Sequence, residues 1–119
     1  MDIDPYYRSQ ILKSIRQDRH NFWFGLYFKT KAKKTSDISE QGILYAEAKK
    51  YFRLSYDEST KTDNIDYCSL FFWIELVWYC CDDIDVTIPL KQLFLDIPDD
   101  HVLLKQSVHD LLEEVYLYT

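Results

Sequence analysis

The chain has 119 residues and a formal net charge of −6, which is unevenly distributed: residues 1–61 carry +4, whereas residues 62–119 carry −10. This length predicts one domain over residues 1–119, and a hydrophobic content of 47% suffices for a core without metals or disulfides. Two glycines and three prolines argue against a turn-rich barrel or sandwich. The phosphate loops, nucleophile elbows and dinucleotide fingerprints of common enzyme classes are missing from the sequence. We therefore expect a binding protein and no enzyme.

The N-terminal segment predicts a helix. Asp4 provides a capping side chain, and Pro5 suits the first turn that follows. Apolar residues then recur at helical spacing as far as residue 27, which predicts either one long helix or two helices with a break near His20 and Asn21. The aromatic density of residues 22–28 also permits a strand at that place.

The next part of the chain alternates between polar connections and a helix. Residues 29–36 hold four lysines and no apolar residue larger than alanine, so they are predicted to form a solvated, mobile connection. Asp37 and Glu40 have the spacing of a capping box, which predicts a helix that ends near residues 53–56. The polar residues 57–64 are predicted to form a loop.

The most apolar segment is residues 67–81. With a cap at Asp63 or Asn64, it predicts a helix that is apolar on almost every side, and such a helix usually lies at the centre of a bundle. Its 15 residues include Ser69 and Glu75 and are too few to span a bilayer, so we expect no membrane association.

Two further helices complete the predicted fold. Thr87 and Pro89 begin a short helix that stops before Pro98. The last helix is expected to open at residues 98–100, where acidic side chains favour a helix N-terminus. Its predicted buried stripe consists of Leu104, Val108, Leu111, Val115 and Tyr118. The sequence therefore predicts an all-α, single-domain bundle of about five helices around a hydrophobic central helix.

The cysteines are predicted to be reduced structural thiols in the core. Cys80 and Cys81 are adjacent, a spacing that ordinarily cannot close an unstrained disulfide, and Cys68 is the only other cysteine. The N-terminus is acidic and shows no apolar signal core. Both observations predict a cytoplasmic location.

No metal or cofactor is expected. The aspartates from residue 82 to residue 85 begin like a calcium loop, but Ile88 and Phe94 stand where that loop needs a glycine and a glutamate. His101 and His109 on one helix are about 12 Å apart, too far to share a metal. His109 and Glu113 are expected to form an ordinary solvated pair.

The acidic half carries the predicted binding surface. Loop aspartates bracket the short fourth helix, two glutamates follow on the last helix, and aromatic residues lie nearby in sequence. Acidic rims around aromatic anchors suit a basic protein partner, although the same acids can also serve solubility alone. The predicted partner-binding residues are Asp82, Asp83, Asp85, Asp96, Asp99, Asp100, Glu113, Glu114, Phe94 and Tyr116.

The N-terminal half offers a competing surface. Basic residues with interleaved aromatics have the composition of a phosphate-binding face, and only Asp18 opposes them. The same face can instead complement the acidic half of this molecule or of a second copy, and the oligomeric state stays open. Because the net charge is negative and no nucleic-acid motif is present, we expect no nucleic-acid partner. The residues concerned are Lys13, Arg16, Arg19, Lys29, Lys31, Lys33 and Lys34.

A small, acidic, aromatic-rich and glycine-poor helical chain without catalytic apparatus resembles the immunity proteins that bacteria make against toxins of contact-dependent inhibition and bacteriocin systems. The resemblance is one of type across the whole chain. The acidic helix signature of the colicin-nuclease immunity proteins is not found, so no family residue is carried over. The resemblance implies a cognate toxin domain, often a nuclease with a basic active site, that is neutralised by a tight one-to-one complex.

Two other classes remain as alternatives. Poxviral Bcl-2-like proteins are also small, helical and aromatic-rich around a hydrophobic central helix, which residues 67–81 would supply; they act by sequestering host signalling proteins, and their usual core is somewhat longer. The other class is a nucleic-acid-binding accessory protein that uses the basic face of residues 13–34.

Overall fold

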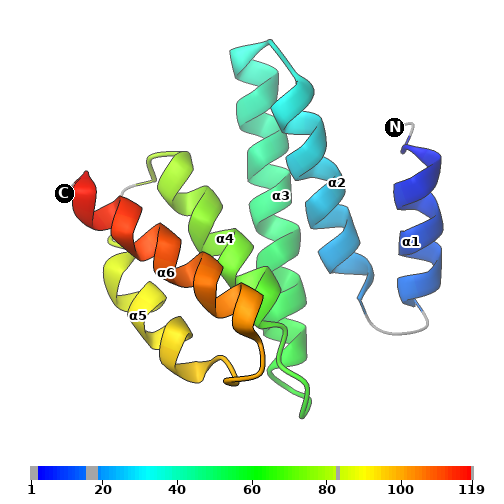
Figure 1. Cartoon of the computed structure of the whole chain (residues 1–119). Coiled ribbons are helices and arrows are strands. Elements are labelled where there is room, and N and C mark those ends of the chain that lie inside the picture. Colours follow the sequence, from blue (N-terminus) through cyan, green and yellow to red (C-terminus); the bar gives the residue numbers. More distant parts are fainter. Residues whose placement is uncertain (1–2, 16–18, 83, 119) are drawn as a thin grey trace.

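The structure is a computed structural model that describes residues 3–15, 19–82 and 84–118. Within these ranges all regular structure is helical (Figure 1), which confirms the all-α prediction. The described helices number six, one more than expected, because the first apolar segment divides in two. They are α1 (Pro5–Ile15), α2 (His20–Lys34), α3 (Ile38–Ser59), α4 (Tyr67–Tyr79), α5 (Thr87–Asp96) and α6 (Val102–Leu117).

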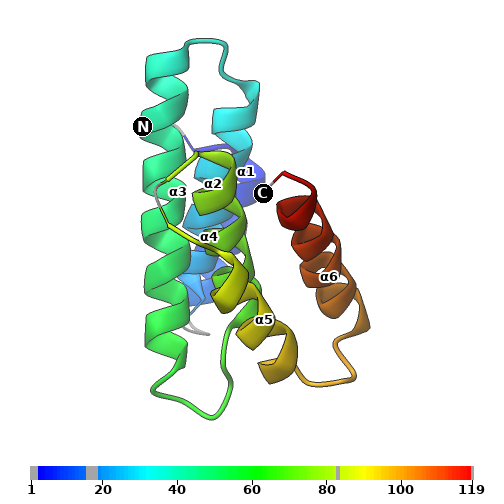
Figure 2. The ribbon, with the colours of Figure 1, turned by 90° about the vertical axis from the view of Figure 1, so that its left-hand side faces the viewer.

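Helix α4 lies at the centre of the fold. It packs against α3 on one side and against α5 and α6 on the other, while α2 joins α3 and α1 flanks α2 (Figure 1). Figure 2 shows α3 and α6 at opposite edges of the molecule, with α4 between them. Leu76 of α4 belongs to the buried cluster of the α2–α3 side, and Ile74 and Val77 belong to the cluster of the α5–α6 side. The predicted central helix is therefore confirmed.

The basic residues after position 28 continue α2. The strand alternative for residues 22–28 is wrong, and so is the predicted mobile connection over residues 29–36, because α2 runs to Lys34. Ala32 is fully buried, and Lys29 Nζ lies 3.2 Å from Glu75 Oε1 and over the Phe72 ring. These contacts with α3 and α4 stabilise residues 29–34 as a helix, although their lysine-rich composition suggested a solvated connection.

The start of α3 was predictable from its cap, but its end was not. The Asp37 carboxylate accepts a hydrogen bond from the Glu40 N–H at 2.9 Å, as the capping-box pattern predicts. The helix then continues to Ser59 instead of ending near residues 53–56. Ser59 at the end of this extension accepts a hydrogen bond from the Asp66 N–H at 2.8 Å, and the buried Ser55 donates one to the Asp66 carboxylate at 2.7 Å.

Asp66 caps α4 in place of the predicted Asp63 or Asn64. Its carboxylate accepts hydrogen bonds from the backbone N–H of Ser69 at 3.0 Å and from the Ser69 hydroxyl at 2.6 Å. Together with the bond from Ser55, these interactions satisfy a carboxylate that is only 6% exposed. One buried acid therefore ties the end of α3 to the start of α4.

Helices α5 and α6 form an antiparallel pair. Helix α5 ends before Pro98, as predicted, whereas α6 begins at Val102 because residues 98–101 form a turn. Of the predicted stripe, Val108, Leu111 and Val115 are buried, Leu104 is half-buried, and Tyr118 is exposed. Among the described residues, none of the helices combines the length and apolar character needed to cross a membrane.

The three cysteines are free thiols in different surroundings. Burial, with a contribution from Asp66, raises the pKa of Cys68 to about 11, and burial also raises the pKa of Cys80. Cys81 is exposed, so the prediction that it belongs to the core is wrong. It lies just past the last residue of α4 and adopts a positive φ of 56°, which places its side chain outside the apolar face.

Candidate partner-binding surface

The predicted acidic residues fall at both ends of α5. Asp82 and Asp85 precede this helix, whereas Asp96 ends it and two further aspartates follow. Because α5 spans 10 residues, about 15 Å, the aspartates form two groups and no single cluster. Asp83 lies outside the described residues. The remaining predicted residues are Asp99 and Asp100 in the turn before α6, Phe94 on α5, and Glu113, Glu114 and Tyr116 on α6.

Asp82 is positioned by the end of α4. The Asp82 N–H donates to the Val77 carbonyl at 3.1 Å, and the Cys81 N–H donates to the Trp78 carbonyl at 3.2 Å. This pair of bonds is a Schellman motif with Cys81 at the position where glycine is usual. The turn places the Asp82 carboxylate 2.8 Å from Lys49 Nζ on α3, so Asp82 is partly neutralised within the molecule.

Asp85 acts as a cap for α5. Its carboxylate accepts the Thr87 N–H at 2.9 Å, and hydrogen bonding to Thr87 holds the pKa of Asp85 below its usual value. The side chain is nevertheless exposed, so its charge faces solvent before the first turn of α5.

Phe94 and Asp99 share a lysine at the other end of α5. Lys105 Nζ lies 2.9 Å from Asp99 Oδ1 and 4.8 Å from the centre of the half-buried Phe94 ring. The hydrogen bond from Lys105 lowers the pKa of Asp99. Asp96 accepts a hydrogen bond from Gln92 at 2.8 Å, while Asp100 is exposed beside His101. Lys105 therefore covers the face of the Phe94 ring, which the sequence suggested as an anchor for a partner.

Tyr116 and Glu114 differ in what they present to solvent. Tyr116 is 54% exposed, and Lys91 Nζ lies 5.4 Å from its ring centre. Glu114 faces α4 instead, where it accepts a hydrogen bond from Trp78 Nε1 at 3.1 Å. A hydrogen bond to Glu114, together with burial, raises the pKa of Tyr79 to about 12. Glu114 therefore joins α6 to α4, whereas Tyr116 belongs to the outer surface.

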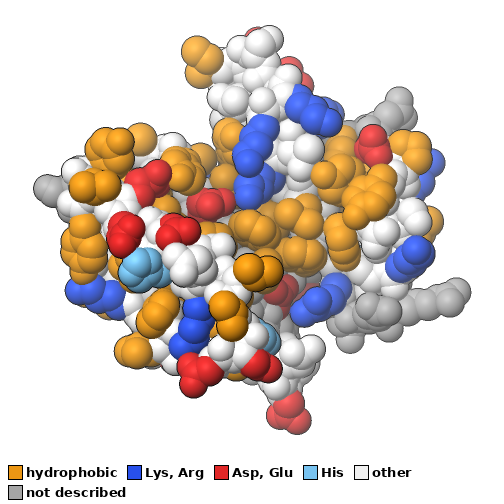
Figure 3. All heavy atoms as spheres, in the orientation of Figure 1, with side chains coloured by type: hydrophobic (Ala, Val, Ile, Leu, Met, Phe, Trp, Pro, Cys, Tyr) orange, Lys and Arg blue, Asp and Glu red, His pale blue; other side chains and the backbone are white. Residues whose placement is uncertain are grey.

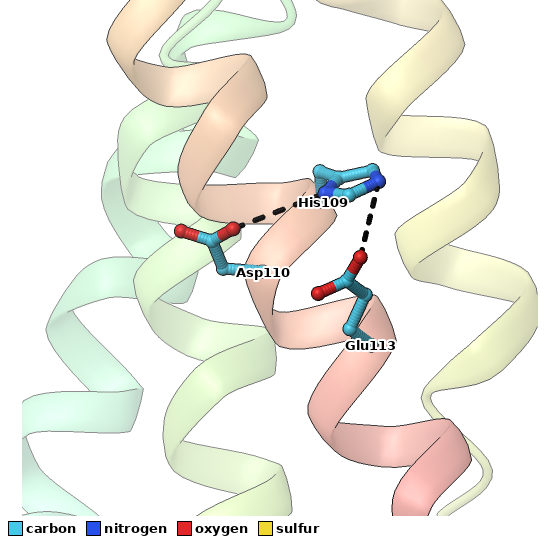
Figure 4. A group of neighbouring side chains, drawn as sticks. All are labelled: His109, Asp110 and Glu113. Atoms are coloured by element: carbon cyan, nitrogen blue, oxygen red, sulfur yellow. Dashed lines mark ion pairs between the residues drawn. The ribbon is translucent and has the colours of Figure 1, made fainter.

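One turn of α6 gathers three exposed groups (Figure 4). His109 lies 3.6 Å from Glu113 and 3.8 Å from Asp110, as the predicted solvated pair of His109 and Glu113 requires. The ligand atoms lie within 4.8 Å of one another, close enough to face a single cation. All three side chains are exposed on one helix, and exposed groups of this kind are common without an ion. They add two carboxylates to the outer surface of α6.

The competing basic face is partly used inside the molecule. Lys29 pairs with Glu75, and Lys31 lies 5.8 Å from the centre of the Tyr27 ring. Lys33 and Lys34 are exposed on the last turn of α2. Arg16 lies outside the described residues, as does the opposing Asp18. Fewer cations are therefore free along this face than the sequence suggested.

Sequence reasoning missed a cavity among α2, α3 and α4. Its lining residues come from positions 29–80, so no local pattern identifies them as a group. Gly42 could have pointed to this cavity from the sequence alone, because it interrupts a helical pattern. A glycine in that position often marks a packing or functional constraint.

Comparisons with known proteins give no relative for this chain: no family model, curated protein or solved structure matches it.

Proposed function

We propose that this chain is an inhibitor that binds a basic protein partner through an acidic surface on α5 and α6. The partner in this proposal is a toxin domain, such as a nuclease, whose basic active site the surface covers. We define the acidic surface by its exposed carboxylates, which form no ion pair with a lysine or arginine of the described residues: Asp85, Asp96, Asp100, Asp110 and Glu113.

The observation that carries this proposal is that none of these five carboxylates forms an ion pair with a lysine or arginine of the described residues. Charges of one sign at both ends of α5 and on α6 raise the potential over this surface and steer an oppositely charged protein toward it. The two lysines of this half, Lys91 and Lys105, lie over the rings of Tyr116 and Phe94. Both rings therefore already hold a cation of the chain over their faces, and an arginine of a partner has to displace that lysine to take the same position.

The test uses the product of the neighbouring open reading frame as the partner. The purified proteins are mixed and their affinity is measured by calorimetry at two salt concentrations, and protection is scored as growth of cells that express the partner. The variant reverses Asp96, Asp100 and Glu113 to lysine. None of the three caps a helix, so the fold is expected to survive. We expect a weaker complex, with the larger loss at low salt.

The matched control reverses the same number of exposed charges on the other half of the chain, at Lys13, Lys33 and Lys34. We expect this control to retain binding and protection. A complex that survives the acidic reversal and is lost in the control would contradict the proposal and would favour the nucleic-acid-binding alternative. A partner domain with a strongly acidic surface would contradict it as well.

The Bcl-2-like alternative shares the central hydrophobic helix, which α4 provides. It differs in the expected partner, which is a host signalling protein instead of a toxin domain. Growth protection against a toxin separates the two classes, since a host-directed adaptor gives none.

A further inference from the structure

A surface cavity of about 640 Å³ lies among α2, α3 and α4. Apolar side chains from the three helices surround it, including Ile38, Tyr45, Leu76 and Tyr79. Figure 3 shows the neighbouring hollow between α6 and α2, where hydrophobic side chains gather below basic ones and acidic groups lie on the α6 side. Volume and lining both match small-molecule sites, which are concave, mainly apolar and of about 300–1,000 Å³.

Gly42 lines the cavity. A Cβ built on Gly42 meets no atom within 4 Å, so nothing in the described part of the chain requires a glycine at this position. Glycine disfavours a helix interior, and Gly42 is the fifth residue of α3. Gly25, in contrast, is required by the close approach of Phe52. Gly42 is exposed and lines the cavity, so a bound molecule can approach the backbone of α3 there without meeting a side chain.

The cavity has an unpaired positive charge. Among its lining residues, Lys29 and Glu75 neutralise each other across 3.2 Å. Lys33 is exposed at the rim and makes no ion pair with any residue that the structure describes. Burial raises the pKa of Tyr45, and the hydrogen bond to Glu114 raises the pKa of Tyr79 to about 12, so both phenols are neutral near pH 7.

The neighbouring hollow has the opposite polarity. A second cavity, of about 380 Å³, shares Lys29, Lys33, Glu75 and Tyr79 with the first but continues toward α6. Two acidic side chains, Asp110 and Glu114, line its far side. An anion is therefore attracted to the α3 end of the groove and repelled from the α6 end.

We propose that the cavity beside Gly42 binds an amphipathic organic anion, such as a medium-chain carboxylate. The carboxylate pairs with Lys33 at the rim. The apolar body lies against Leu76 and the tyrosine rings and passes over Gly42, where no side chain blocks it. This site is separate from the acidic surface, so the inference stands whether or not the proposed inhibitor function is correct.

The test uses sodium decanoate as the probe, with decyltrimethylammonium as a cation of the same chain length. Binding to the full chain is measured by calorimetry and located by changes in amide chemical shifts. We expect saturable binding of decanoate, with shifts in α3 and α4 around Gly42 and Leu76, and weaker binding of the cation.

Two variants locate the site. Gly42→Leu adds a bulky side chain at the lining, starting from a Cβ that meets no atom within 4 Å, and it is expected to weaken decanoate binding roughly tenfold or more. Lys33→Glu removes the pairing charge and is expected to weaken it by about tenfold. Their matched controls, Ser39→Leu and Lys34→Glu, add the same side chains outside the lining and are expected to bind like the original chain.

The outcomes are decisive in either direction. Loss of binding in both variants, with both controls unaffected and circular dichroism unchanged, supports the proposed site. The inference is overturned if the original chain shows no saturable binding of decanoate, if the cation binds more tightly, or if Gly42→Leu binds as well as its control.

Discussion

The Phe52 ring packs so closely on Gly25 that a Cβ added to the glycine lies 2.6 Å from Phe52 Cδ1. Phe52 is completely buried and cannot move aside without disturbing α3 against α2. We expect Gly25→Ala to lower the free energy of unfolding by about 1–3 kcal/mol through overpacking, despite alanine's better helix propensity. Chemical denaturation monitored by circular dichroism measures this change.

Gly42→Ala is the matched control for that experiment. It makes the same chemical change in a helix where the new methyl group meets no atom, so only the helix propensity changes. We expect it to raise the free energy of unfolding by about 0.5–1 kcal/mol. Two alanine variants of equal effect would mean that the contact between α2 and α3 is looser than the Gly25 geometry indicates.

Cys81 occupies the glycine position of a Schellman motif. Its φ of 56° is costly for a residue with a Cβ, and its side chain is exposed. We expect Cys81→Gly to raise the free energy of unfolding by up to about 1 kcal/mol. Cys80→Gly is the control: Cys80 has an ordinary φ of −82°, so glycine there relieves no strain, adds chain entropy and removes a half-buried side chain, and it is expected to lower the stability. A Cys81→Gly variant less stable than the original chain would contradict this account.

Asp66 joins α3 to α4 through three hydrogen bonds. Asp66→Ala leaves the hydroxyls of Ser55 and Ser69 and one backbone N–H without their acceptor in a buried place. We expect a loss of about 1–3 kcal/mol in the free energy of unfolding. The comparison is Asp37→Ala, which removes an exposed cap and is expected to cost about 1 kcal/mol. Equal losses for the two variants would show that burial of Asp66 adds nothing.

Local rules predicted the helices better than the contacts between them. The Asp37 cap and the stop before Pro98 depend on neighbouring residues, and both could be read from the sequence. The cap of α4 is also a local contact, between Asp66 and Ser69, but the sequence offered Asp63 and Asn64 as well. The choice of Asp66 and the extension of α3 involve hydrogen bonds of Asp66 with Ser55 and Ser59 across a loop, which no local pattern contains. Lys29 illustrates the same limit: its charge predicted a solvated segment, but its partner lies 46 positions away on α4.

The sequence predicted the negative charge of the candidate surface but not the contacts that its side chains make. The sequence indicated an acidic half with nearby aromatics, and these residues do lie on α5, α6 and their connections. It did not reveal that Lys105 covers Phe94, or that Glu114 faces α4 and bonds to Trp78. The cavity beside Gly42 needs three helices to form, so composition alone gives no sign of its ligand.

The thiols are expected to react in the order of their exposure. At a pH near 8, an alkylating reagent should label Cys81 first, Cys80 more slowly and Cys68 last. The rise of the Cys68 pKa from 9.0 to about 11 lowers its thiolate fraction at this pH by about 100-fold. Because the thiolate is the reactive form, Cys68 should be labelled correspondingly more slowly. Mass spectrometry of labelled peptides gives the three rates. Equal labelling rates for Cys68 and Cys81 in the folded protein would contradict the assigned burial of Cys68. In denaturant, the labelling rates of the three cysteines should become similar.

The hydrogen bond between Tyr79 and Glu114 predicts a loss of stability at high pH. The folded protein raises the pKa of Tyr79 from 10.0 to about 12, so it holds the phenol proton more tightly than the unfolded chain does. The resulting stabilisation is fully present below about pH 10 and declines as the pH rises toward about 12. Glu114→Gln should lower the Tyr79 pKa and flatten this decline, because the carboxylate charge is gone. Ultraviolet absorbance of tyrosinate and denaturation across this pH range measure both effects, with Glu113→Gln as the control one residue away. Identical alkaline profiles for the two glutamine variants would show that Glu114 does not hold the Tyr79 proton.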